Sequence, residues 1–312
     1  MIGTRRREDA PSGAVRRRGA AARGAAVAGA MAMAIGACGG EPGGRTHAET
    51  DVSATEDATV AGATAGTVVA EAEGIRVVRG ARSEPRLAGA RARILAPAPD
   101  AAVEGPEVEV RLGVAAFEPG AMTPGAEERG IAVSPDGQHV HLILDDGAYH
   151  AVYDVSGPVR LEDVPPGPHV LFAFPSRAWH ESVKEEGALA VVPFRVGEPG
   201  EGAAAAPGAV AGPALEGPIL VYSRPKGAYA GADADSVMVD FYLANVVLAP
   251  DGHTVRLTVD GAVSARLTAW VPYYLVGLPT GEHAIALELL DPVGEPVEGL
   301  FARDGTTITV ER

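Results

Sequence analysis

Histidine is the residue type through which this chain of 312 residues is best able to do chemistry. His139 and His141 are separated by one residue in an alternating apolar stretch, so their imidazoles share one face of the expected strand. Neutral imidazole is a good ligand for zinc and for copper. The spacing therefore predicts a Zn or Cu site at His139 and His141, with His150 or His180 as the third ligand.

Other interpretations of these histidines stay open at this point. Glu181 or Asp145 would serve as a third ligand in place of a histidine. Because Val140 and Leu142 take the core side of the strand, we expect the two imidazoles to point outward. The competing interpretation is structural: a solvated strand face that carries two histidines, or histidines that hydrogen-bond to loop backbone.

A second group of polar and aromatic residues predicts a ligand-binding patch. Tyr149, Arg177 and Trp179 lie in or near expected loops, and loops at the ends of β-sandwiches commonly carry recognition. Trp179 with Arg177 would hold a sugar ring, a peptide or an anionic group. The alternative is structural, with Trp179 closing the end of the core and Arg177 pairing with an acid.

Sequence motifs for catalysis are not found in the chain. It contains no Gly-x-Ser-x-Gly elbow, no His-Glu-x-x-His and no phosphate-binding glycine loop between a strand and a helix. A catalytic triad such as Ser176, His180 and Asp145 would have to be assembled from distant residues, and their spacing in the sequence does not indicate one. We therefore expect a protein that is not an enzyme.

Cys38 is the only cysteine and follows Ile35-Gly36-Ala37. An arginine-rich leader and a short apolar run precede it, which is the order of regions in a secretory signal peptide. This stretch resembles the signal of bacterial lipoproteins. The resemblance implies cleavage before Cys38, acylation of Cys38 with chains such as palmitate, and an anchor in the cell envelope. Gly39 after the cysteine implies the outer membrane rather than the inner one.

Acidic residues dominate the chain once the leader is removed. The formal net charge of the whole chain is −15, and residues 1–37 contain seven Arg and two acids, so 19 basic and 39 acidic residues remain, for a formal net of −20. Such a charge repels the phosphate backbone, so no nucleic-acid partner is expected. The expected partners are the membrane, through the lipid on Cys38, and a protein, peptide or glycan.

Two stretches of low complexity divide the chain. Residues 39–72 contain almost no large apolar side chains and cannot bury enough surface to offset their ordering entropy. Residues 198–218 are rich in Gly, Ala and Pro, as linkers are. The expected parts are a signal peptide over 1–37, a flexible tether over 38–87, a first domain over 88–197, a linker over 198–217 and a second domain over 218–312.

The two expected domains repeat one another. Each has a Pro-Asp-Gly turn, at residues 135–137 and 250–252, followed by an alternating stretch and then by a Pro-x-Gly-x-His motif. The distance from the turn glycine to the motif glycine is 30 residues in one domain and 29 in the other. This agreement indicates duplication of one unit. It also favours a structural role for His169 and His283, which end the two motifs.

Alternating apolar residues mark the strands of each domain, and this is the period of a half-buried strand. The runs are Val108, Val110, Leu112 and Val114, then Val140, Leu142 and Leu144, in the first domain, and Val237, Val239, Phe241 and Leu243, then Val255, Leu257 and Val259, in the second. No convincing helical period follows residue 75. Several short strands at regular spacing predict an all-β fold with two tandem sandwiches.

Three segments carry a resemblance to a known fold. Residues 94–97 and 103–108 resemble the first strands of bacterial immunoglobulin-like or fibronectin type III-like domains, and residues 290–297 resemble the last strands. The resemblance implies two tandem immunoglobulin-like β-sandwiches and no particular activity. Residues 137–141 and 176–182 also resemble a group of secreted bacterial proteins, and that likeness implies no activity either.

These observations lead to two hypotheses about function. The first is a lipid-anchored envelope protein that acts as a non-catalytic binding or structural module. The alternative is an envelope protein that binds Zn or Cu through the histidines of the first domain.

Overall fold

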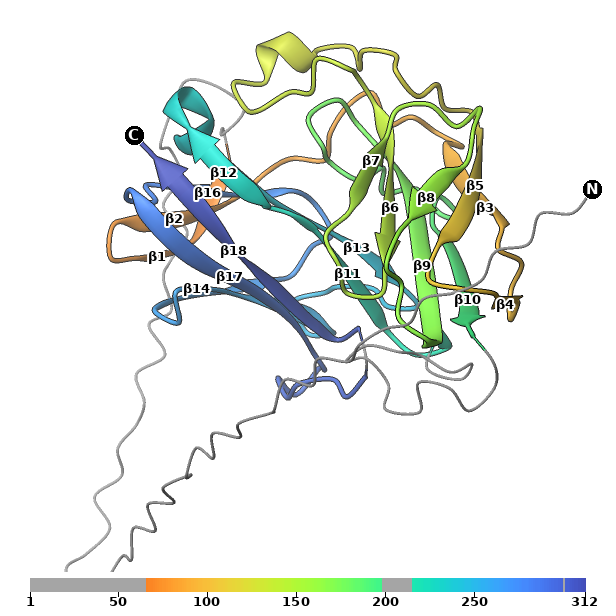
Figure 1. Cartoon of the computed structure of the whole chain (residues 1–312). Helices are drawn as coiled ribbons and strands as arrows, with labels where there is room; N and C mark the ends of the chain where they lie inside the picture. Colours follow the sequence, from red (N-terminus) through yellow and green to blue (C-terminus); the bar gives the residue numbers. More distant parts are fainter. Residues whose placement is uncertain (1–65, 198–214, 300) are drawn as a thin grey trace, which may run out of the picture. The chain divides into compact units, whose positions relative to one another are not determined.

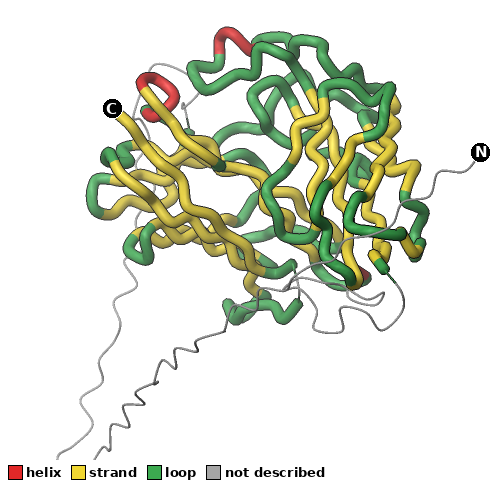
Figure 2. Tube along the Cα trace, in the orientation of Figure 1, coloured by secondary structure: helices red, strands yellow, loops and turns green. Residues whose placement is uncertain are grey.

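The structure is a computed structural model that describes residues 66–197, 215–299 and 301–312 (Figure 1). Strands and loops make up nearly all of these residues, with short 3-10 turns such as η1 (Ala126–Glu128) and η3 (Gly231–Ala234) (Figure 2). Within the described ranges, no helix is long and apolar enough to cross a membrane. The predicted all-β class is confirmed. The predicted signal peptide, Cys38 and the predicted linker up to residue 214 lie outside the described residues.

The first sandwich has a smaller sheet with the order β3-β5-β8 and a larger sheet with the order β4-β10-β9-β6-β7. Its strands are β3 (Arg91–Ala96), β4 (Ala102–Val103), β5 (Val108–Ala115), β6 (His139–Leu144), β7 (His150–Val152), β8 (Val159–Leu161), β9 (Gly167–Ser176) and β10 (Ala190–Val196). Val108 and Val110 of β5 share a buried core with Val140 and Leu142 of β6, as their alternation predicts.

The second sandwich has sheets with the orders β1-β2-β16-β13-β11 and β12-β18-β17-β14-β15. Its strands are β1 (Thr67–Ala72), β2 (Ile75–Arg79), β11 (Ile219–Arg224), β12 (Gly227–Ala230), β13 (Val237–Ala244), β14 (Thr254–Val259), β15 (Val263–Leu267), β16 (Tyr273–Val276), β17 (Gly281–Leu290) and β18 (Arg303–Glu311). Val237 and Val239 of β13 are buried in one core with Val255 and Leu257 of β14.

The predicted tether over 38–87 is wrong at its C-terminal end. Residues 67–79 form the hairpin β1–β2, and β2 pairs antiparallel with β16 of the second sandwich. Ile75 and Val77 are buried in the core of that sandwich, with exposed fractions of 4% and 0%. A segment that precedes the first sandwich in sequence therefore completes the second one.

Local chemistry explains why this hairpin forms. β-branched residues dominate β2 and the start of β1, and such residues favour strands. Glu73 and Gly74 connect the two strands with φ angles of 53° and 80°. Two consecutive residues with positive φ are what a two-residue type I′ hairpin turn requires. The prediction failed because it weighed the composition of residues 39–72, and the apolar runs begin only at the edge of that window.

The predicted duplication is visible as one hydrogen-bonded pair that occurs in both sandwiches. Asp145, directly after β6, accepts hydrogen bonds from Nδ1 of His169 (2.7 Å) and from the N–H of the residue after it (2.8 Å). Asp260, directly after β14, accepts the equivalent bonds from His283 and its successor, both at 2.7 Å. Nε2 of each histidine donates to a proline carbonyl. Both histidines therefore hold turns of the repeat in place, which is the structural role expected of them.

A further buried cluster joins the two sandwiches. Ile143 of β6 and Phe174 of β9 pack with Ile219 of β11 and Tyr242 of β13. The rings of Phe174 and Tyr242 are 5.0 Å apart between centroids. The face of β6 and β9 that points away from the first core is therefore covered by the second sandwich.

Candidate metal site

The strand β6 places His139 and His141 on the face turned away from the core of the first sandwich. The expected direction of these side chains is therefore confirmed. Both side chains are 0% exposed, however, because strands of the second sandwich cover this face. The alternative of a solvated strand face is contradicted by this burial. The alternative of a histidine that hydrogen-bonds to loop backbone describes His139, whose Nδ1 lies 3.0 Å from the carbonyl of Gly137.

His180 approaches the same pair from the loop after β9. Its N–H donates to the carbonyl of Arg177 (2.8 Å), and the N–H of Arg177 donates to the carbonyl of Glu181 (2.9 Å), which closes a tight turn. His180 has a φ angle of 65°, in the left-handed region that side chains with a Cβ rarely adopt. Such strain persists only when surrounding contacts hold it. One of these contacts is the hydrogen bond from the N–H of Ser182 to Asp240 (2.9 Å).

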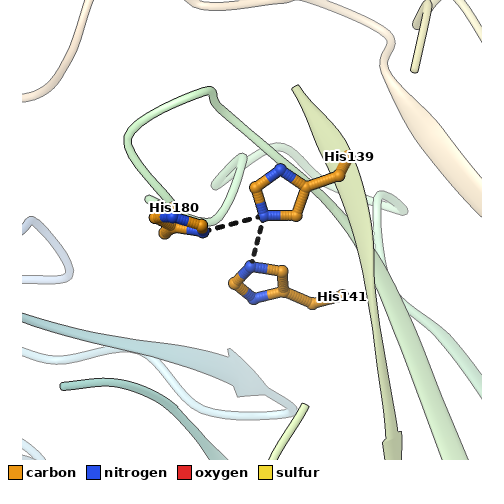
Figure 3. A group of neighbouring side chains, drawn as sticks. All are labelled: His139, His141 and His180. Atoms are coloured by element: carbon orange, nitrogen blue, oxygen red, sulfur yellow. Dashed lines mark hydrogen bonds between the residues drawn. The ribbon is translucent and has the colours of Figure 1, made fainter. Parts of the chain in front are cut away.

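Three imidazole nitrogens converge at one point between the sandwiches (Figure 3). Nε2 of His139 lies 3.0 Å from Nε2 of His141 and 3.0 Å from Nδ1 of His180, and all three atoms lie within 4.8 Å of one another. Three ligands of a tetrahedral zinc ion, each near 2.1 Å from the metal, would be separated by about 3.4 Å. The two separations of 3.0 Å lie close to that value, and the third is at most 4.8 Å.

Hydrogen bonds at the far side of two rings hold their converging nitrogens in place. Nδ1 of His139 donates to the carbonyl of Gly137 (3.0 Å), so the lone pair of that ring is on Nε2. Nδ1 of His141 lies 3.1 Å from Oγ of Ser223 in β11. Outer hydrogen bonds of this kind orient histidine ligands in metal sites. Ser223 also shows that the second sandwich contributes to the site.

Burial keeps these imidazoles neutral. Removal from water lowers the pKa of His139 to about 4 and that of His180 to about 2, and nearby Arg224 contributes to both shifts. Burial likewise lowers the pKa of His141 well below its ordinary value. An unprotonated imidazole is the form that binds a metal. At neutral pH the three rings therefore present lone pairs and no positive charge.

Aromatic rings enclose the three histidines. The ring of His141 stacks on Tyr149 with centroids 3.7 Å apart and planes 11° from parallel, and Tyr153 lies 4.7 Å from the ring of His139. Burial raises the pKa of Tyr149 to about 12, so its phenol stays protonated at neutral pH. Its hydroxyl lies 3.4 Å from Nδ1 of His180. These rings limit the access of water to the converging nitrogens.

His150 does not belong to this group, so its place among the predicted ligands is wrong. It pairs directly with Leu142 across β6 and β7, whereas His141 pairs with Ala151. Directly opposed residues of an antiparallel pair lie on the same face of the sheet. His150 is therefore on the face of Leu142, opposite to the face of His139 and His141, and it is exposed.

The predicted ligand-binding patch is not an exposed surface. Tyr149, Arg177 and Trp179 have exposed fractions of 4%, 3% and 1%. Nε1 of Trp179 donates to Glu181 (2.7 Å), and Nη1 of Arg177 lies 3.8 Å from the same carboxylate. The guanidinium of Arg129 lies over the indole, 4.1 Å from the ring centroid. The structural alternative for Trp179 and Arg177 describes their contacts correctly.

Three residues of the second sandwich belong to the surroundings of this site, and the sequence does not predict that they lie beside the histidines. Ser223, Arg224 and Lys226 lie at the end of β11 and just after it. Lys226 sits over the ring of Tyr149, with Nζ 3.7 Å from its centroid, and donates to the carbonyl of Tyr149 (2.8 Å). About 80 residues separate these side chains from the histidine pair, and no sequence pattern links them.

Comparison with known proteins assigns no family to this chain. No protein-family model matches the sequence, and no curated protein matches it either. Among solved structures, the fibronectin(III)-like modules of Clostridium thermocellum CbhA are 14% identical, with 70% of this chain and 94% of that chain covered and a TM-score of 0.24.

A second similar structure is SGBP-B of the Bacteroides ovatus mixed-linkage glucan utilization locus, solved with a mixed-linkage heptasaccharide. It is 15% identical, and the match covers 70% of this chain and 47% of that chain, with a TM-score of 0.20. The central fibronectin-III array of RIM-binding protein is 12% identical over 65% of this chain and 64% of that chain, with a TM-score of 0.19. Similarity at this level does not assign a function.

Proposed function

We propose that this protein binds a zinc or copper ion through His139, His141 and His180. The observation that carries the proposal is the convergence of three imidazole nitrogens, two from buried histidines and one from the partly buried His180, with two separations of 3.0 Å. Imidazole suits both metals, and three histidines form a recurrent protein ligand set for zinc. The role proposed is metal binding.

A shared cation accounts for the arrangement better than hydrogen bonds between the rings do. Nδ1 of His139 carries the proton that bonds Gly137, so Nε2 of His139 has a single lone pair. Two other ring nitrogens approach that lone pair at the same distance, and it cannot accept two good hydrogen bonds at once. A metal ion at the common point uses all three lone pairs.

The cellular setting of this metal site forms a second part of the proposal. We infer that the leader directs export, that Cys38 is acylated, and that the protein is held in the bacterial envelope, at the outer membrane rather than the inner one. Support comes from the order of basic leader, apolar run and Cys38 in the sequence. Mass spectrometry of the mature protein would detect the lipid, and a Cys38→Ser variant released into the soluble fraction would support the anchor.

Calorimetry on the purified full chain tests the metal site. Zn²⁺ and Cu²⁺ should bind with one ion per chain, and the double variant His139→Ala/His141→Ala should lose this binding. His150→Ala is the matched control, because His150 is an exposed histidine of the same sandwich on the other sheet face. Equal binding by the control and the double variant would disprove the site.

A groove favours a second candidate function, the binding of a glycan or peptide. It has a volume of about 670 Å³ and contains Tyr242, Trp270, Glu185 and Asn245 in its wall. Aromatic rings beside carboxylate and amide groups suit a sugar ring or a peptide. Trp270→Ala should weaken glycan or peptide binding in an array experiment and leave zinc binding unchanged. An array with no bound ligand would remove this candidate.

A further inference from the structure

A small cavity adjoins the histidine cluster. It has a volume of about 10 Å³, and its wall includes His180 together with Arg224 of β11 and Ser236, which precedes β13. That volume is about what a single water-sized group occupies. The rest of the wall is largely apolar and includes the side chains of Ile131, Trp179 and Met238. The cavity is therefore too small for an organic ligand.

Two hydrogen-bond donors in this wall have no acceptor. Nε of Arg224 and Oγ of Ser236 are buried atoms without a hydrogen-bond partner among the described residues. A buried donor without a partner destabilises the folded state by about 1–3 kcal/mol, so such atoms are rare. Both atoms belong to residues of the same cavity wall. The presence of two unpartnered donors on one cavity wall points to a small acceptor that occupies the cavity.

His180 supplies a third donor when it ligates a metal. Its Nδ1 faces the other two rings, while its second nitrogen is directed away from them (Figure 3). Ligation through Nδ1 leaves the proton on Nε2, which then requires an acceptor. His139 and His141 have such outer partners in Gly137 and Ser223. An acceptor in the cavity would give His180 the equivalent partner.

The charges around the site favour an anion over a neutral water. Arg224 and Lys226 are the cations that act on the imidazoles of His139, His141 and His180. No carboxylate is among the described residues of the cavity wall. A bound metal would add further positive charge, and buried charge of one sign is costly without a counter-charge.

We propose that the cavity lined by His180, Arg224 and Ser236 binds one monatomic anion, chloride in solution, as the counter-ion of the metal site. The anion accepts hydrogen bonds from Nε of Arg224, Oγ of Ser236 and Nε2 of His180. Its coupling to the metal rests on the proposed function, but the two orphaned donors predict the anion site independently. Anion and metal then strengthen each other's binding, because such coupling is reciprocal.

Calorimetry in two salts of equal ionic strength tests the coupling. Zn²⁺ should bind the full chain about tenfold more tightly in sodium chloride than in sodium methanesulfonate, whose anion is too large for the cavity. Chloride complexes zinc weakly in bulk solution, so any effect of the salt outside the protein acts in the opposite direction. Equal affinities in the two salts would indicate a water in the cavity and overturn the proposal.

Variants distinguish the effect of the two unpartnered donors on chloride binding from the effect of positive charge in general. Arg224→Lys keeps the positive charge and removes Nε, and Ser236→Ala removes one neutral donor. Each should bind zinc but lose most of the chloride effect. Arg303→Lys and Ser264→Ala make the same changes at exposed positions and should keep the full effect. A full chloride effect in Arg224→Lys would contradict the proposed contact.

Chloride binding without metal distinguishes failure of this inference from failure of the metal site. The ³⁵Cl NMR line of the metal-free full chain should be broadened, and Arg224→Lys should remove the excess width while Arg303→Lys does not. Excess width without zinc binding would disprove the metal site and retain the anion site. Zinc binding with neither excess width nor salt dependence would disprove the anion site alone.

Discussion

His180 combines a functional position with an unfavourable backbone. Its φ angle of 65° lies in the left-handed region, and its ring supplies one of the three nitrogens of the proposed metal site. Left-handed backbone costs about 1–2 kcal/mol for a residue with a Cβ. Conformational strain of this kind is concentrated at functional sites. At the scale of one residue, the proposed metal site accounts for a backbone conformation that lowers stability.

Replacing this histidine by glycine should separate the two effects. In His180→Gly, the free energy of unfolding of the metal-free protein should stay equal or rise by up to about 1 kcal/mol, while zinc binding is lost. His150→Gly is the control, because His150 lies in a regular strand where glycine should destabilise. Urea unfolding followed by circular dichroism measures both. A large loss of stability in His180→Gly would contradict this account.

The buried imidazoles should also make metal-free stability depend on pH. The folded pKa of His139 is about 4 against an ordinary value of 6.5, so the unfolded chain binds more protons in this interval. The free energy of unfolding should fall as pH decreases from about 6.5 to about 4, by roughly 3 kcal/mol from His139 alone. His141 and His180, whose pKa values are also lowered, act in the same direction.

Unfolding at a series of pH values measures this slope. His139→Ala/His141→Ala should show a shallower decrease than the unaltered chain. His169 and His283 act in the opposite direction: burial opposes their charged form, but hydrogen bonds to Asp145 and Asp260 raise their pKa values. Their stabilisation is present below pH 6.5 and is lost as pH rises through the folded pKa. An unchanged acid slope in the double variant would contradict the prediction.

At the scale of elements, the hairpin β1–β2 shows how a strand can belong to a distant sandwich. β2 hydrogen-bonds β16 although the whole first sandwich separates them in the chain. The buried side chains of β2 enter the core of the second sandwich. The hairpin therefore protects an edge of β16 that would otherwise be unpaired, and unpaired edges promote association.

A side-chain substitution in β2 tests whether this strand belongs to the second sandwich. Ile75→Ala should lower the free energy of unfolding by about 3 kcal/mol, because Ile75 is 4% exposed and leaves a cavity in the core. Arg79→Ala, at an exposed position of the same strand, should change it by less than about 0.5 kcal/mol. Chemical denaturation of both variants provides the comparison. No effect of Ile75→Ala would support the tether originally expected for this segment.

At the scale of the whole described structure, contacts between the sandwiches hold the loop that carries His180. Asp240 of β13 is 0% exposed and accepts hydrogen bonds from Nζ of Lys184 and from the N–H of Ser182. Lys184 and Ser182 both lie in that loop of the first sandwich. The second sandwich therefore positions a ligand of the proposed metal site without contributing a ligand itself.

Removing this buried carboxylate should destabilise the protein and weaken the metal site. Asp240→Ala leaves the ammonium of Lys184 buried and unpaired, so the free energy of unfolding should fall by about 3–5 kcal/mol. Zinc affinity should also fall, because the loop loses its anchor. Asp235→Ala breaks an exposed pair with Arg312 and should cost at most about 1 kcal/mol. Asp240→Leu/Lys184→Met should recover much of the stability, and failure to do so would contradict the charge argument.

Sequence alone determined those features that depend on neighbouring residues. The period of two predicted the strands, placed Val140 and Leu142 in the core, and put His139 and His141 together on the opposite face. The repeat also indicated the structural role of His169. The second domain has a matching histidine, His283, but has no histidines at the positions that match His139 and His141. Each of these inferences needs only the local geometry of a strand or a turn.

Tertiary structure alone decided what lies against that face. It buried the two imidazoles, brought His180 to them and kept His150 on the other face of the sheet. It also buried Trp179 and placed Ser223 and Arg224 around the imidazoles. It also assigned Ile75 to a core more than a hundred residues away. The physical reason is that sheet faces pack according to the summed shape and polarity of many side chains, and residue spacing along one strand carries no record of the surface that will cover it.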